Sequence, residues 1–185
     1  MTHEQAEPLR DGLKRVAVAL KEAEIPFALT GGYAAWARGG PEPDHDVDFL
    51  VPEDLAERAA QELARRGFDV EQPAEDWLFK VRFGTAVVDV LHRTTGSPLA
   101  EVLARADEAA VLSVRMPVLA ATDVVAEKLL ALDEHYCDLA QVLPVVRALR
   151  EQVDWDTVSA RCTDHPFAEA VLFLLERLDV LSSRA

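Results

Sequence analysis

The chain has 185 residues, half of them hydrophobic, and a formal net charge of −14 from 19 basic and 33 acidic side chains. This length supports one domain, or a larger and a smaller one packed together, and the apolar content argues against disorder. A uniformly negative field repels polyanions, which counts against a general nucleic-acid binder unless a local basic patch overrides it. The apolar runs are far shorter than the roughly 20 residues of a membrane-spanning helix, and the polar start MTHEQAEPLRDG is not typical of a signal peptide. We therefore expect a cytoplasmic protein with no membrane partner.

The cysteines and histidines do not form metal-binding patterns. Cys137 and Cys162 belong to no CxxC motif, and the five histidines are scattered without HExxH or HxH spacing. Two reduced thiols are the simplest interpretation, and a structural zinc site is excluded.

The first part of the chain mixes helical and extended patterns. Helical spacing of apolar residues predicts helices over 4–24, 33–38, 52–66 and 99–106. Short apolar or alternating segments predict strands over 27–30, 47–51, 68–70, 77–83, 86–92 and 110–115, with the segments 77–83 and 86–92 forming a hairpin.

From Thr122 onward the pattern is helical only. Four helices are predicted over 122–132, 136–149, 154–162 and 166–181. The composition changes near Met116 and Pro117, which suggests an α/β catalytic domain over 1–118 and a helical subdomain over 119–185. The expected fold class is therefore α/β (α+β): a mixed sheet with flanking helices, followed by a C-terminal helical bundle.

Three aspartates are candidate metal ligands. Asp46 and Asp48 flank the start of the predicted strand 47–51, and residues two apart in a strand point to the same face. Asp89 lies in an otherwise apolar strand, where a carboxylate is costly unless it is paired or binds a metal. On adjacent strands the three could hold two Mg²⁺ ions that bind nucleotide phosphates and activate an attacking hydroxyl. The alternatives are solvated strand ends and, for Asp89, an edge-strand or capping role.

Two glycines are candidate phosphate-binding residues. Gly31 and Gly32 lie between the predicted strand 27–30 and the predicted helix 33–38. Without Cβ atoms, the backbone N–H groups at the start of a helix can approach an anion closely. Such a pair followed by a DxD about a dozen residues later favours a combined phosphate and metal site.

The order strand, Gly-Gly, helix, loop, DxD and later strand aspartate resembles the nucleotidyltransferase superfamily related to DNA polymerase β. Gly31 and Gly32 match its glycine motif, Asp46 and Asp48 its paired metal ligands, and Asp89 its third carboxylate. The start GGYAAWARG and the helical tail are most similar to small bacterial proteins around the antibiotic nucleotidyltransferases and the AbiEii-type toxins. The resemblance implies Mg²⁺-dependent transfer of a nucleoside monophosphate from an NTP to a hydroxyl, with release of pyrophosphate.

The chain departs from this pattern in two places. Many relatives have a serine where this chain has Gly32. Many also have an Arg and a Thr before the DxD, where this chain has the acidic segment 41–45, PEPDH. These departures bear on how the triphosphate charge would be balanced.

Four further residues are candidates for nucleotide binding. Arg38 could supply part of the positive charge missing from segment 41–45, and Lys80 shares a strand face that could adjoin Asp89. Lys128 and Asp138 resemble a Lys…Asp pair that lines the cleft in AbiEii-like proteins; the alternative for the two is an interhelical ion pair. Glu127, next to Lys128, is expected at the surface.

The sequence thus predicts a nucleotidyltransferase whose acceptor stays open. Net acidity fits a cationic small molecule, whereas the toxin-like tail fits an AbiEii-like toxin that modifies tRNA and has an antitoxin partner. The alternative from another class is a catalytically inactive nucleotide-binding or protein-interaction module.

Overall fold

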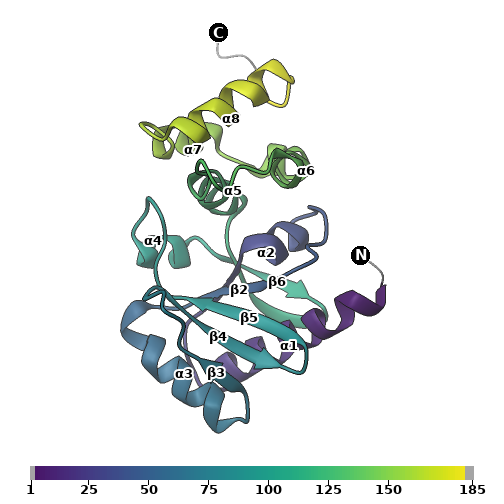
Figure 1. Ribbon diagram of the computed structural model, residues 1–185, viewed down its shortest axis with the longest axis vertical. Coiled ribbons are helices and arrows are strands. Elements are labelled where there is room, and N and C mark those ends of the chain that lie inside the picture. The colour runs from purple at the N-terminus through teal and green to yellow at the C-terminus, as the bar shows by residue number, and fades with distance from the viewer. Residues whose placement is uncertain (1–2, 182–185) are drawn as a thin grey trace.

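The computed structural model describes residues 3–181 and stacks two parts along its long axis (Figure 1). The lower part contains a seven-stranded sheet with strands β1 (Ala28–Thr30), β2 (Val47–Leu50), β3 (Asp69–Glu71), β4 (Leu78–Phe83), β5 (Ala86–Leu91), β6 (Asp107–Val111) and β7 (Val114–Val118). Its helices are α1 (His3–Glu22), α2 (Gly31–Ala37), α3 (Ala56–Arg65) and α4 (Leu99–Ala104), with a 3₁₀ turn η1 (Glu53–Leu55) before α3. The upper part consists of α5 (Ala121–Leu130), α6 (Leu139–Leu149), the 3₁₀ turn η2 (Arg150–Gln152), α7 (Trp155–Arg161) and α8 (Pro166–Arg177).

The sheet is mixed, with the strand order β3-β4-β5-β2-β1-β7-β6. The β2–β5 and β1–β7 pairs are parallel, and the other four neighbouring pairs are antiparallel. The central position of β2 explains its sequence, because Val47 and Phe49 are fully buried.

Helices cover both faces of the sheet. The long helix α1 packs across β5, β7, β2 and β4 and also contacts α3, while α2 packs on β1 and β2 from the other side (Figure 1). The apolar stripe of α1 is responsible: Leu13, Val16 and Leu20 have no exposed surface.

The upper part is organised around α5. This helix contacts α6, α7 and α8 and also packs on α2 in the lower part. Val125, Ala126 and Leu129 are fully buried, as expected for a helix that has neighbours on several sides. Through α5, the C-terminal helices lie over the sheet end that carries α2 (Figure 1). No helix within residues 3–181 combines the length and the apolarity needed to span a bilayer.

The fold class is confirmed, with one error in the strands. The segment 110–115 was predicted as a single strand, but it contains the end of β6, a turn and the start of β7. Leu112 and Ser113 form the turn with φ of 50° and 70°, a conformation usually marked by Gly or Asn. Met116 and Pro117, where the composition changes, lie inside β7.

Candidate active site

A cavity of about 1020 Å³ lies between the sheet and the C-terminal helices. Its lower wall comes from the ends of β1 and β2, the start of α2 and the segment 41–45, and its upper wall comes from α5, α6 and the segment between them. Six of the residues singled out in the sequence line this cavity: Gly31, Gly32, Asp46, Asp48, Lys128 and Asp138. Three others do not: Arg38, Lys80 and Asp89.

The sheet side of the site is a row of four polar residues on neighbouring strands. Thr30 of β1 pairs with Asp48 of β2, Asp48 pairs with Asp89 of β5, and Asp89 pairs with Lys80 of β4. Because residues paired in register present their side chains on the same face of a sheet, the four side chains lie side by side. Thr30 and Asp89 are each only 8% exposed.

Asp46 lines the cavity, but strand geometry is not the reason. It precedes β2 by one residue and has a φ of 35°, so strand alternation with Asp48 does not place its side chain. Both aspartates nevertheless line the same cavity. The expectation that they lie together holds, although the reason given for it does not.

Asp48 is the most perturbed carboxyl group of the site. Burial, together with the negative charges of Asp89 and Asp46, raises the pKa of Asp48 to about 7, and the charge of Lys128 opposes this shift. A carboxylate crowded by two others binds a cation or a proton more readily than an isolated one. The centre of the row is therefore a place where added positive charge is favourable.

Lys80 already neutralises the neighbouring carboxylate. Its Nζ lies 2.9 Å from Oδ1 and 2.8 Å from Oδ2 of Asp89 and donates hydrogen bonds to both. Burial lowers the pKa of Lys80, but the hydrogen bonds and the charge of Asp89 outweigh it and raise the pKa overall, so Lys80 stays charged. Lys80 does share a strand face with Asp89, but it forms a tight pair with that carboxylate, and a role of Lys80 in nucleotide binding stays a prediction.

The two glycines make room for protein atoms. Gly31 has a φ of 61°, and a Cβ added there would lie 1.9 Å from Oδ2 of Asp48. A Cβ on Gly32 would lie 2.8 Å from Cβ of Pro43. Both glycines are thus required by the close approach of Asp48 and of segment 41–45. A role of their N–H groups in phosphate binding stays a prediction.

The acidic segment 41–45 is partly neutralised. Arg10 of α1 donates from Nε and Nη2 to the two oxygens of Glu42 at 2.7 and 2.6 Å. Asp44 lies 2.5 Å from Nδ1 of His45. The segment therefore adds less negative charge to the cavity than its sequence indicates.

Arg38 and Asp138 are engaged in structural contacts. Arg38 Nε donates to the carbonyl of Leu119 at 2.5 Å, and its Nη2 donates to the carbonyl of Val118 at 3.0 Å. Asp138 lines the cavity, but its Oδ1 accepts from the N–H of Ala140 at 2.8 Å and caps α6. Nucleotide binding by these two residues stays a prediction.

Lys128 projects from α5 into the upper side of the cavity. Within residues 3–181 its ammonium group has no ion-pair partner, and Asp48 is the charge that acts on it. Burial lowers the pKa of Lys128, and Asp48 partly offsets this. The interhelical ion pair with Asp138 is absent from the described residues, which leaves the ammonium available to an anionic ligand.

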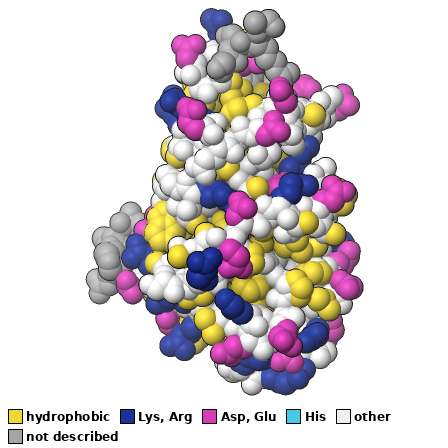
Figure 2. Space-filling view, turned by 180° about the vertical axis from the view of Figure 1, so that it is seen from behind, with side chains coloured by type: hydrophobic (Ala, Val, Ile, Leu, Met, Phe, Trp, Pro, Cys, Tyr) yellow, Lys and Arg dark blue, Asp and Glu magenta, His cyan; other side chains and the backbone are white. Residues whose placement is uncertain are grey.

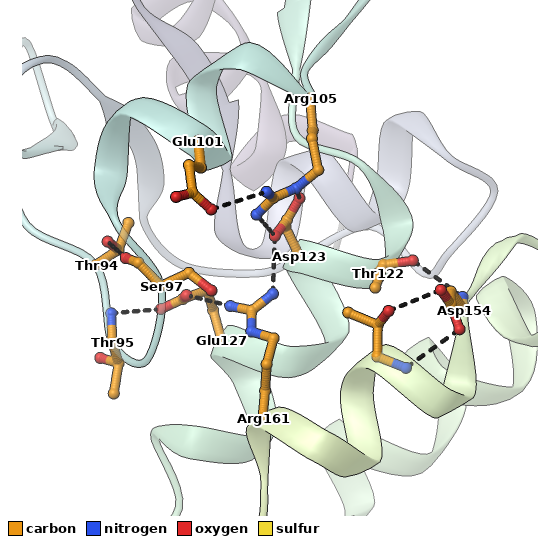
Figure 3. Close-up of polar contacts among 11 residues, drawn as sticks. Thr94, Thr95, Ser97, Glu101, Arg105, Thr122, Asp123, Glu127, Asp154 and Arg161 are labelled. Atoms are coloured by element: carbon orange, nitrogen blue, oxygen red, sulfur yellow. Dashed lines mark hydrogen bonds and ion pairs between the residues drawn. The ribbon is translucent and has the colours of Figure 1, made fainter.

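A network of charged residues fixes α5 (Figure 3). Asp123, only 1% exposed, accepts two hydrogen bonds from Arg105 at 3.0 and 2.7 Å and one from Arg161 at 2.8 Å. Arg161 also donates to Glu127 at 2.9 Å, and Glu127 accepts from the N–H of Thr95 at 2.8 Å. The network thus connects α4, α5, α7 and the segment after β5.

Sequence reasoning misjudged Glu127. It was expected at the surface, but it is half-buried, lines the cavity and belongs to this network. Its partner Arg161 is 34 positions away in the sequence, so no local pattern signals the contact. Thr30, Arg93 and Thr95 also line the cavity without having been singled out.

The carboxylates offer oxygen ligands of the kind that Mg²⁺ prefers. Asp46 and Asp48 fit such an ion, because both face the cavity and the charge of Asp46 already disfavours the ionised form of Asp48. Among residues 3–181, however, no three His, Cys, Asp or Glu side chains are grouped so that they could hold one metal ion. A site made by all three aspartates therefore stays a prediction.

Comparison with known proteins places the chain in a family. The model of a family described as an uncharacterised nucleotidyltransferase matches residues 1–181. The chain belongs to this nucleotidyltransferase family. A search of curated protein sequences gave no significant match.

Solved structures of antibiotic-modifying enzymes share the fold of this family member. The antibiotic-resistance factor ANT(2″)-Ia, in complex with adenylyl-2″-tobramycin, superposes with a TM-score of 0.64 at 15% identity, covering 88% of this chain and 98% of its own. The lincosamide antibiotic adenylyltransferase LnuA, lincomycin-bound, gives 0.53 at 12% identity over 73% and 92%. An antigenic nucleotidyltransferase-like protein from Paracoccidioides brasiliensis gives 0.59 at 14% identity over 97% and 92%. At these identities the similarity concerns the fold.

Proposed function

We propose that this family member transfers a nucleoside monophosphate from an NTP to a hydroxyl group of a small cationic molecule, with Mg²⁺ as cofactor. The observation that carries the proposal is one cavity lined by Asp46 and Asp48 on the sheet side and by Lys128 on α5, whose ammonium has no ion-pair partner within residues 3–181. Carboxylates for a metal ion opposite a cation for phosphate are what a metal–triphosphate complex requires.

Each residue has a defined task in this proposal. Asp46 and Asp48 hold the metal ion, which when bound neutralises phosphate charge and polarises the phosphate that is attacked. Lys128 binds a phosphate from the α5 side, so that the triphosphate is held between the sheet and the helices. Gly31 and Gly32 line the same cavity, and we assign their N–H groups as further donors to phosphate.

The transfer itself is an in-line displacement. The acceptor oxygen forms a bond to the α-phosphorus, the bond from that phosphorus to the bridging oxygen breaks, and pyrophosphate leaves with the electron pair. The acceptor's hydroxyl proton leaves to water in the open cavity, because Asp89 does not line the cavity and both of its oxygens are held by Lys80.

The acceptor side of the cavity favours a small molecule. Apolar and aromatic residues such as Trp77, Tyr136 and Val142 line it together with the carboxylates of Asp44 and Asp138. A ring system with attached ammonium groups has the matching chemistry. Two structures that share the fold were solved with small molecules, adenylyl-2″-tobramycin in one and lincomycin in the other.

A polyanionic acceptor such as tRNA has less support. On the face shown in Figure 2, the described basic and acidic side chains are interspersed and do not form a continuous basic stripe. The net charge of −14 also opposes RNA binding. An AbiEii-like role with an antitoxin would require a basic surface of the kind that binds phosphates along a strand.

The test is direct transfer of label. The protein is incubated with each α-³²P-labelled NTP, Mg²⁺ and a panel of aminoglycosides, lincosamides and bulk tRNA, and the products are separated and identified by mass. We expect one nucleotide and a small cationic acceptor to give an adduct, and Asp48→Asn to abolish it. Asp69→Asn, an exposed carboxylate at the sheet edge, is the matched control. Equal labelling by the wild type and by Asp48→Asn would exclude the proposed site.

A further inference from the structure

Asp89, the third of the candidate metal-binding aspartates, is already paired with a cation of the protein itself. Both oxygens of Asp89 accept hydrogen bonds from Lys80, at 2.9 and 2.8 Å. The Asp89 side chain is only 12% exposed, so little of its remaining surface is open to another ligand. An ammonium group in this position supplies the positive charge that a second metal ion would otherwise bring.

The pairing is built into the backbone. Lys80 and Asp89 face each other directly in the antiparallel pair of β4 and β5, which are joined by the two-residue turn Gly84-Thr85. Six residue pairs in continuous register hold this hairpin, from Leu78 and Leu91 to Phe83 and Ala86. The register of a tight hairpin is fixed by its turn, so Lys80 is held opposite Asp89.

The lining of the cavity separates Asp89 from the other two aspartates in the same way. Asp46 and Asp48 line it, whereas Asp89 and Lys80 do not. Within residues 3–181 no group of three acidic or metal-binding side chains is arranged around one point. A two-metal site of a phosphoryl-transfer enzyme holds two ions about 3.5–4 Å apart, and here one of the three carboxylates that could hold them is engaged by Lys80.

We propose that the Lys80 ammonium takes the place of a second metal ion, so that the protein with bound nucleotide holds a single divalent ion on Asp46 and Asp48. This inference rests on the proposed nucleotidyl transfer and deepens it, because it makes Asp89 a carboxylate positioned by Lys80 and not a metal ligand. Lys80 is thus a positioning residue that fixes the metal requirement of the site.

The test counts metal ions. The full chain is saturated with a non-hydrolysable NTP analogue, and Mn²⁺ is titrated while the free ion is followed by electron paramagnetic resonance. We expect one Mn²⁺ per chain for the wild type and for Lys80→Arg, and two for Lys80→Met, in which Asp89 is released. Two ions in the wild type would overturn the inference and leave the proposed function standing, whereas absence of both nucleotide and Mn²⁺ binding would overturn both.

A second variant does not depend on the folding of Lys80→Met. Asp89 is next to Asp48 in the sheet, so in the proposal it acts on the ion only from outside the coordination sphere. Asp89→Asn should therefore leave one bound Mn²⁺ ion, weakened by no more than the roughly 10- to 100-fold typical of losing an outer-sphere partner. Loss of all Mn²⁺ binding in Asp89→Asn, with the fold verified by circular dichroism, would contradict the proposal.

Discussion

Gly31 and Asp48 are in such close contact that the glycine has no room for a side chain. Its Cβ would lie 1.9 Å from Oδ2 of Asp48, and its φ of 61° is itself unfavourable for other residues. The left-handed conformation costs about 1–2 kcal/mol, and the overlap adds a further cost of about 1–3 kcal/mol. We therefore expect Gly31→Ala to lower the free energy of unfolding and to displace Asp48 enough to abolish transfer.

Gly84 provides the matched control for this substitution. It has nearly the same φ, 58°, but a Cβ there would meet no heavy atom within 4 Å. Urea unfolding should therefore show the cost of the conformation alone for Gly84→Ala, about 1–2 kcal/mol, with transfer activity retained. Equal destabilisation by the two variants would show that Asp48 moves aside without cost.

The raised pKa of Asp48 predicts a pH-dependent effect on stability. Because the folded state raises this pKa from the ordinary 3.8 to about 7, the folded chain binds the proton more tightly than the unfolded chain does. Asp48 therefore does not lower the free energy of unfolding below about pH 4. The reduction grows as the pH rises and is complete above about pH 7. In metal-free buffer with EDTA, Asp48→Asn should be more stable than the wild type at pH 8, by about 1–3 kcal/mol, and this gain should shrink towards pH 4.

Urea unfolding at pH 4, 6 and 8 measures this difference, with Asp69→Asn at the sheet edge as the control. The control should show no comparable gain at pH 8. A gain for Asp48→Asn that is the same at all three pH values would assign the effect to packing and not to charge.

Lys128 is expected to act on nucleotide affinity more than on folding. It makes no ion pair within the described residues, so its replacement removes no protein contact of that kind, whereas a charged hydrogen bond to phosphate is worth about 1.5–3 kcal/mol. Lys128→Met should weaken binding of an NTP about 10- to 100-fold, measured by isothermal titration calorimetry, while the melting temperature is retained. Lys14→Met, at a half-buried position of α1 that does not line the cavity, is the control. Unchanged NTP affinity would remove Lys128 from the phosphate site.

The Asp123 network predicts a large effect from a residue outside the cavity. Replacing Arg161 by Gln takes one of two guanidinium partners from the buried Asp123 and one from Glu127. Breaking a buried ion pair typically costs about 3–5 kcal/mol. We expect Arg161→Gln to lose about that much stability in urea unfolding and also to raise the KM for NTP, because Glu127 adjoins Lys128. The exposed Arg147 of α6, changed to Gln, should alter neither quantity.

The parts of the site that could be predicted from the sequence depend on local pattern. Alternation put Lys80 on one face of its strand, and the register of the hairpin sets that face beside Asp89. The turn at Leu112 and Ser113 was missed because neither residue is the Gly or Asn that usually marks a turn with positive φ. Arg161 and Glu127 were beyond prediction since they meet only through the packing of α7 on α5. The pairing of Arg10 with Glu42 was hidden in the same way, by 32 residues of separation.

The adjacent positions of Glu127 and Lys128 on α5 have a mechanical consequence. Glu127 accepts a hydrogen bond from Thr95, in the segment that follows β5. Lys128 lines the cavity where the triphosphate is proposed to bind. Turning α5 about its axis would therefore move Lys128 and stretch the bond to Thr95 at the same time. Since α6, α7 and α8 all contact α5, a ligand bound to Lys128 would also restrict rotation of these helices relative to the sheet.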